Sequence, residues 1–167
     1  MKSSMCVVSL VFLCSGALAG SKNTLEVEDF SIPLDGSEAF CRIYARSEQA
    51  FDAFSFGLRF DATKLAFERL ELGEALSAGG ESDACFSREL ETPGEVVVGC
   101  VTSAGPEARQ LDGAERHHVA TLVLHALPGV VEGDVILVDF ESDLGEPPVE
   151  NLLASSGDEI SVTTAGG

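Results

Sequence analysis

Two cysteines flank the strongest turn signal in the sequence and could form a disulfide. Glu91-Thr92-Pro93-Gly94 predicts a tight turn between two short apolar runs. If Thr92 and Pro93 form the tip, residues whose numbers sum to 185 face each other across the hairpin, and Cys85 and Cys100 meet this condition. The pair is therefore a candidate cross-strand disulfide, with two buried thiols as the alternative.

A disulfide requires an oxidising compartment, and the N-terminus predicts export. An apolar run over residues 5–13 is followed by Ala17-Leu18-Ala19, with small residues at the positions that signal peptidase reads. We expect residues 1–19 to be a signal peptide and residues 20–167 to be one secreted, periplasmic or cell-surface domain. The run is too short to span a bilayer and no longer one follows, so no transmembrane segment is predicted.

Removal of the signal peptide leaves three of the five cysteines, the third being Cys41. No neighbouring His or Asn suggests a catalytic pairing for it. We expect Cys41 to be a core thiol, not a nucleophile.

The three histidines are the obvious place to look for a metal or a base. His117 and His118 are adjacent, so on a strand their rings point to opposite faces and cannot chelate one ion. By the same alternation His125 should share a face with His117 and not with His118. No zinc-binding spacing is present.

Carboxylates at alternate positions, Asp139, Glu141 and Asp143, have the spacing of a calcium loop. However, Leu144 stands where an EF-hand needs glycine, so we interpret these residues as outward acidic side chains. The sequence also contains no nucleophile elbow, phosphate-binding loop or dinucleotide fingerprint. No catalytic, metal-binding or cofactor-binding residue is predicted, and we expect the protein not to be an enzyme.

The charge balance excludes further classes of partner. The 167 residues include 28 Asp and Glu against 10 Lys and Arg, a formal charge of −18 that becomes −19 once Lys2 leaves with the signal peptide. Nucleic-acid binding needs a cluster of basic residues, and the sequence contains no basic stretch. A hydrophobic content of 45% argues against disorder.

The elements that must position these residues are short strands. In the clearest one, residues 54–60, four apolar residues alternate with Ser, Gly and Arg. The run 65–72 changes phase part-way, which a bulge or a short helical turn would explain. Turns recur regularly and no long window has helical periodicity, so we predict an all-β single sandwich of about nine strands. The other expected strands are 25–28 continuing through 30–32, 40–45, 85–90, 95–101, 118–127, 135–140 and 159–164.

Several of these strands resemble a known family. Phe60-Asp61-Ala62-Thr63-Lys64-Leu65 resembles the strand–turn–Leu step of cohesin modules, and the Gly94–Gly99 and His118–Leu124 segments are similar to later cohesin strands. The resemblance extends over residues 24–164. It implies a jelly-roll sandwich related to carbohydrate-binding modules, and a non-catalytic module that recognises a protein or cell surface, with a dockerin-like protein as a candidate partner.

The alternative function is a carbohydrate-binding module whose partner is a polysaccharide. Such modules use exposed aromatic side chains to stack on sugars. The sequence contains no Trp and one Tyr, Tyr44, so this residue is the one to test.

Overall fold

The computed structural model describes residues 23–77, 84–102 and 109–167. These residues form eleven strands and one four-residue helix, α1, at Glu74–Ser77. The strands are β1 (Thr24–Val27), β2 (Ala39–Arg46), β3 (Ala53–Phe60), β4 (Leu65–Leu72), β5 (Ala84–Glu89), β6 (Glu95–Val101), β7 (Arg116–Ala126), β8 (Val138–Phe140), β9 (Leu152–Ser155), β10 (Asp158–Ser161) and β11 (Thr163–Ala165).

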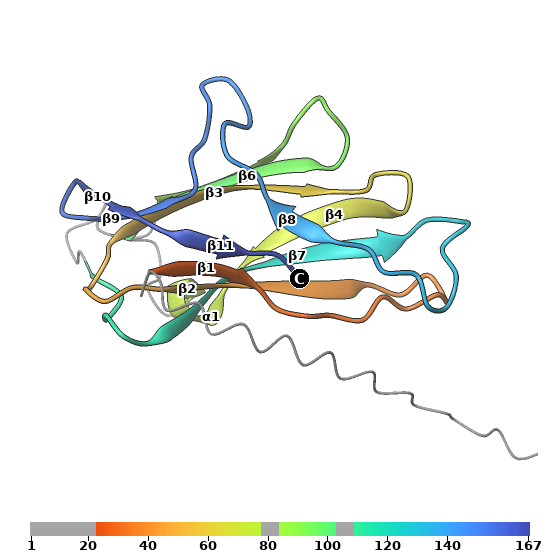
Figure 1. Ribbon diagram of the computed structural model, residues 1–167, viewed down its shortest axis with the longest axis horizontal. Coiled ribbons are helices and arrows are strands. Elements are labelled where there is room, and N and C mark those ends of the chain that lie inside the picture. Colours follow the sequence, from red (N-terminus) through yellow and green to blue (C-terminus); the bar gives the residue numbers. More distant parts are fainter. Residues whose placement is uncertain (1–22, 78–83, 103–108) are drawn as a thin grey trace, which may run out of the picture.

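The strands form two stacked sheets (Figure 1). The first has the order β11-β1-β2-β7-β4, and the second has the order β10-β9-β3-β6-β5 with β8 also paired to β3. All neighbours are antiparallel except β1 and β11. The prediction of an all-β sandwich is confirmed.

The core lies between the sheets because one residue in two along each strand is apolar and points inward. On β3 the inward residues are the four apolar ones of the predicted alternation, Phe54 to Phe60, and all of them are buried. Ile43 on β2 and Leu122 on β7 meet them from the first sheet as members of the same buried cluster.

Most of the strand boundaries agree with the sequence prediction. The segments 65–72 and 95–101 are strands from end to end, and the phase change in 65–72 is a bulge between Phe67 and Arg69. The hairpin of β5 and β6 has the expected register, in which Cys85 is opposite Cys100.

Three strand predictions were wrong in part. Residues 30–32 and 135–137 are outside strands: Phe30, Ile32 and Ile136 pack against the core without strand pairing, while Val135 and Leu137 are exposed. The segment 159–164 is divided between β10 and β11, which belong to different sheets. Strand β9 was missed because Leu152–Ser155 is only four residues long.

Candidate recognition surface

The outer face of the second sheet carries small and apolar side chains where an antiparallel sheet normally presents polar ones to water. In one row across the strands, Ala84, Val101, Ala53 and Ala154 are successive cross-strand partners. In the next row the partners are Phe86, Gly99, Ser55 and Leu152. We call the seven apolar residues the apolar patch: Ala53, Ala84, Phe86, Gly99, Val101, Leu152 and Ala154.

The two largest exposed side chains of the apolar patch are diagonal neighbours on β5 and β6. Phe86 is 55% exposed and Val101 is 40% exposed. The ring of Phe86 covers Gly99, and a Cβ added to that glycine would lie 2.6 Å from the ring's Cζ. Gly99 therefore permits the ring to lie against the sheet.

The loop of residues 141–151 limits the apolar patch on one side. It rises from the second sheet on the side away from the first, and is drawn in blue in Figure 1. Its Leu144 is buried against Gly57, where an added Cβ would lie 3.0 Å from the Leu144 Cδ1. The Gly57 amide donates to the Asn151 Oδ1 at 2.9 Å, and the Val149 amide donates to the Leu144 carbonyl at 2.8 Å. The loop is therefore fixed to the sheet and occupies this part of its outer face.

Beyond the loop, the same face ends in a charged cluster. Arg59 donates from its Nη2 to the Glu95 Oε1 at 2.8 Å and lies 3.4 Å from Glu141. The hydrogen bond to Glu95 raises the pKa of Arg59 above its ordinary value, with a smaller contribution from Glu141. These groups are partnered and solvated, and the 141–151 loop lies between them and the apolar patch.

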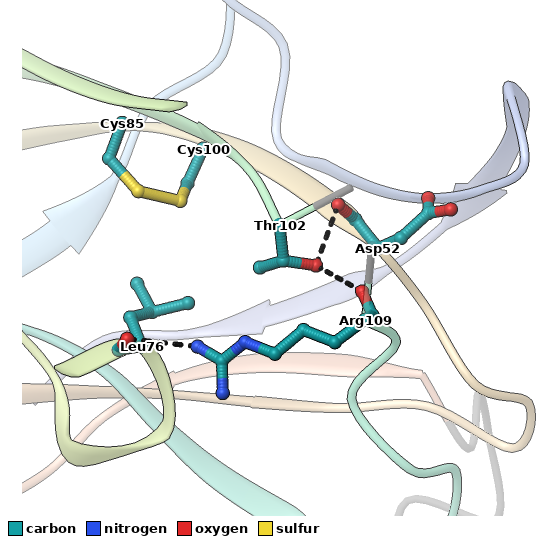
Figure 2. The surroundings of a disulfide bond; sticks show 6 residues. All are labelled: Asp52, Leu76, Cys85, Cys100, Thr102 and Arg109. Atoms are coloured by element: carbon teal, nitrogen blue, oxygen red, sulfur yellow. Dashed lines mark hydrogen bonds between the residues drawn. A yellow bond between two sulfur atoms is a disulfide. The ribbon is translucent and has the colours of Figure 1, made fainter. Parts of the chain in front are cut away.

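Cys85 and Cys100 lie beneath the apolar patch, on the inward side of β5 and β6 (Figure 2). The structure joins their sulfur atoms, and their Cα atoms are 4.0 Å apart. Two residues further along, Thr102 holds the end of β6: its amide donates to the Asp52 carbonyl at 2.8 Å, and its hydroxyl lies 2.7 Å from the Arg109 carbonyl. Strand β6 is thus well fixed next to the sulfur bridge.

Comparisons with known proteins identify the architecture. No protein-family model matches the chain, and no curated protein matches it. Solved structures do match. A cohesin of ScaC from Acetivibrio cellulolyticus, solved in complex with the ScaB dockerin, has a TM-score of 0.67 at 16% identity, covering 87% of this chain and 95% of that one.

The fold is cohesin-like. A cohesin from Clostridium thermocellum, also in a complex with a dockerin, has a TM-score of 0.66 at 13% identity and covers 91% of this chain and 94% of that one. A non-cellulosomal cohesin from the archaeon Archaeoglobus fulgidus has a TM-score of 0.63 at 12% identity and covers 88% of each chain. At these identities the likeness shows the cohesin-like fold, and the site must be argued from this chain's own residues.

The histidines lie on the other sheet, where the Nε2 atom of each ring has a polar partner: the Asp112 carbonyl for His117, the Thr121 hydroxyl for His118 and the Glu68 carboxylate for His125. His118 is opposite Tyr44 and His117 is opposite Ala45, so the two rings point to opposite faces as predicted. The prediction for His125 was wrong. A register shift leaves Val119 unpaired between His118 and Ala120, so His118 and His125 share the outer face of the first sheet.

The one tyrosine is not an open stacking surface. The guanidinium of Arg116 lies 3.5 Å from the centre of the Tyr44 ring, and the His118 ring lies 5.3 Å away. These side chains, with Arg42 and Glu74, line a shallow hollow of about 500 Å³ on the first sheet. Because Arg116 occupies one face of the ring, the arrangement lends no support to a polysaccharide partner.

The alternate carboxylates are dispersed around β8 and the following loop. Asp139 is opposite Arg59 on the outer face, Glu141 pairs with the same arginine, and Asp143 has a φ of 66°. Within residues 23–77, 84–102 and 109–167, no three His, Cys, Asp or Glu side chains are arranged to hold a metal ion.

Cys41 is fully buried on β2. Burial raises the pKa of its thiol to about 12, with a smaller contribution from the charge of Glu28. A thiol with this pKa is protonated at neutral pH and is a poor nucleophile.

The predicted signal peptide, residues 1–19, lies outside the described residues. In the described part of the chain, no helix is long and apolar enough to cross a membrane.

Proposed function

We propose that this protein is an exported, non-catalytic recognition module that binds a protein partner of the dockerin type through the apolar patch. The observation that carries the proposal is the apolar outer face of β5, β6, β3 and β9. A soluble domain of formal charge −19 has ample polar side chains for this face, yet seven of its eight positions in two rows are apolar.

The shape of the face favours a protein over a small molecule. Small ligands are held in concave sites that surround them, whereas the apolar patch lies across the outer face of four strands with Phe86 and Val101 exposed. Protein interfaces have an apolar centre with exposed aromatic anchors and a polar border. Phe86 is such an anchor, and polar groups lie beside it on the same face: Ser55 in its row and the exposed Arg88 two residues along β5.

The cohesin-like fold supports a dockerin-type partner. The solved structures from Acetivibrio cellulolyticus and Clostridium thermocellum are complexes of cohesins with dockerins. Two arginines near the patch, Arg59 and Arg88, are outnumbered by acidic residues in a chain of strongly negative charge, so we expect the partner's contact surface to be apolar with basic residues around it.

Export is part of the proposal. The N-terminal pattern and the paired cysteines are both typical of proteins that fold in an oxidising compartment. Expression of the full chain in a secreting host should give a product that begins at Gly20, which intact-mass measurement would detect. A product that retains residues 1–19 in the membrane fraction would contradict it.

Binding is tested with the secreted protein against a panel of purified dockerins, by calorimetry, in calcium and in chelator. We expect at least one dockerin to bind in calcium. Phe86→Glu should weaken that binding at least tenfold, because loss of an aromatic anchor typically costs roughly 2 kcal/mol or more.

The matched control is Phe40→Glu on β2. Phe40 is also an exposed strand phenylalanine, 46% exposed, but it lies on the outer face of the first sheet. Equal loss of binding in both variants, or no binding of any dockerin by the folded protein, would contradict the proposed function. Binding of polysaccharide alone that is lost in Tyr44→Ala would favour the carbohydrate-binding alternative.

A further inference from the structure

Strand β5 contributes little to the core. Among the described residues, it is the edge strand of the second sheet, with β6 as its one neighbour. Five of its six residues are exposed, and these include Ser87 and Glu89, which point toward the inner side. Cys85 is the single residue of β5 that is not exposed. An edge strand with so few buried contacts belongs to the low-stability end of a fold.

Strand β6, in contrast, is well packed and paired along both edges. It lies between β5 and β3, its residues from Val96 to Cys100 are buried, and Thr102 fixes its end to Asp52. The sulfur bridge therefore connects a strand with almost no packing of its own to one of the best-packed strands of the sandwich.

The position of the bridge matters for the apolar patch. Cys85 lies between Ala84 and Phe86, two of the patch residues, and its partner Cys100 lies between Gly99 and Val101, two others. Phe86 keeps its place over Gly99 only while the backbone of β5 stays in register with β6.

We propose that the bond between Cys85 and Cys100 is a redox switch for the apolar patch, and that it does not hold the whole fold together. The inference rests on the proposed function, since it assigns regulation to the same apolar patch. In the oxidised protein, β5 is fixed and Phe86 lies on Gly99. In the reduced protein, β5 separates from β6 locally and Phe86 no longer lies over Gly99, while the rest of the sandwich remains folded.

The chemical step is thiol–disulfide exchange with an external dithiol. A thiolate of the reductant attacks the sulfur of Cys85, the partly buried and more accessible one, and Cys100 leaves as a thiolate that takes up a proton. The second thiol of the reductant resolves the mixed disulfide and releases Cys85 as a thiol. The protein gains two electrons and two protons, and the reductant becomes a disulfide.

The test measures hydrogen exchange by mass spectrometry in the secreted protein, with and without dithiothreitol. On reduction we expect the amides of 84–89 to exchange at least tenfold faster, while those of β2, at 39–46, are unchanged. Reoxidation should restore the original rates. The double variant Cys85→Ala, Cys100→Ala is the control: it should show fast exchange at 84–89 in both conditions and no response to dithiothreitol.

Three results would overturn the switch. The first is a folded protein that contains no bond between Cys85 and Cys100, and the second is unchanged exchange at 84–89 on reduction. The third is exchange of β2 as fast as that of β5 after reduction, which would show that the bond stabilises the whole fold. None of these readouts uses a partner. A failure of the switch is therefore distinguishable from a failure of the proposed function, in which the oxidised protein binds no dockerin.

Discussion

The ring of Phe86 on β5 lies over Gly99 on β6, its direct cross-strand partner. This relationship links the edge strand to the apolar patch: the glycine leaves the space that the ring fills, and the ring covers backbone that would otherwise face water. One side of the ring lies against Gly99, and more than half of the surface of Phe86 is exposed for contact with a partner.

Gly99→Val should displace the Phe86 ring from its position over β6. The new side chain would overlap the ring of Phe86, so we expect a loss of about 1–3 kcal/mol in the free energy of unfolding and a loss of partner binding. Denaturant unfolding measures the first effect. Because the clash is between two side chains, the double variant Gly99→Val, Phe86→Ala should recover part of the stability. Strictly additive losses would mean that the two residues do not interact.

Leu144→Ala should loosen the 141–151 loop without disturbing the sandwich. Leu144 is buried against Gly57, and removing a buried leucine side chain costs about 2–5 kcal/mol where the site cannot collapse. Faster hydrogen exchange confined to 141–151 is the expected result. The exposed Leu137→Ala is the control, since its side chain contributes little burial. Unchanged exchange in the Leu144 variant would show that the hydrogen bonds of the loop, among them those of Asn151 and Val149, hold it without this side chain.

The sheet architecture was predictable because it depends on alternation along the chain. The inward residues of β3 and the register of Cys85 with Cys100 both follow from local sequence, the first from periodicity and the second from a turn. The shared face of His118 and His125 could not be obtained in this way. It depends on one extra residue in β7, whose place is set by pairing with β2, a strand about 80 residues away in the chain.

The apolar patch was missed for a related reason. Its residues come from four strands, and each strand contributes only one or two of them, so no single segment looks unusual. Ala53, Ser55 and Gly57 were visible as the small residues on the polar side of the best strand, and that was the available signal. Only the pairing of β5, β6, β3 and β9 brings Ala53 and Ser55 into the same rows as Val101 and Phe86.

Asp52→Ala should destabilise the β9–β10 turn. The buried carboxylate of Asp52 accepts the amide of Ser156 at 3.1 and 3.2 Å, and Ser156 has a φ of 52°, a conformation that needs such support. Loss of the acceptor removes this hydrogen bond, but Ser156 is exposed and water can replace the carboxylate, so we expect a loss of about 1 kcal/mol. Thermal unfolding measures the loss. Asp52→Asn keeps one oxygen in place and should lose less, whereas equal losses would point to the charge and not to the hydrogen bond.

Cys41 should make the protein less stable in alkali. Burial raises the pKa of the thiol in the folded state from 9.0 to about 12, while the unfolded chain has the ordinary value. Below pH 9 the thiol is protonated in both states and has no effect on the pH dependence. Between pH 9 and 12 only the unfolded state releases the proton, so the free energy of unfolding falls as the pH rises, by about 1 kcal/mol per pH unit. Cys41→Val removes the titrating group and should flatten this part of the stability curve measured by denaturant unfolding. Identical slopes for the two proteins above pH 9 would show that the thiol ionises as readily in the folded state as in the unfolded one.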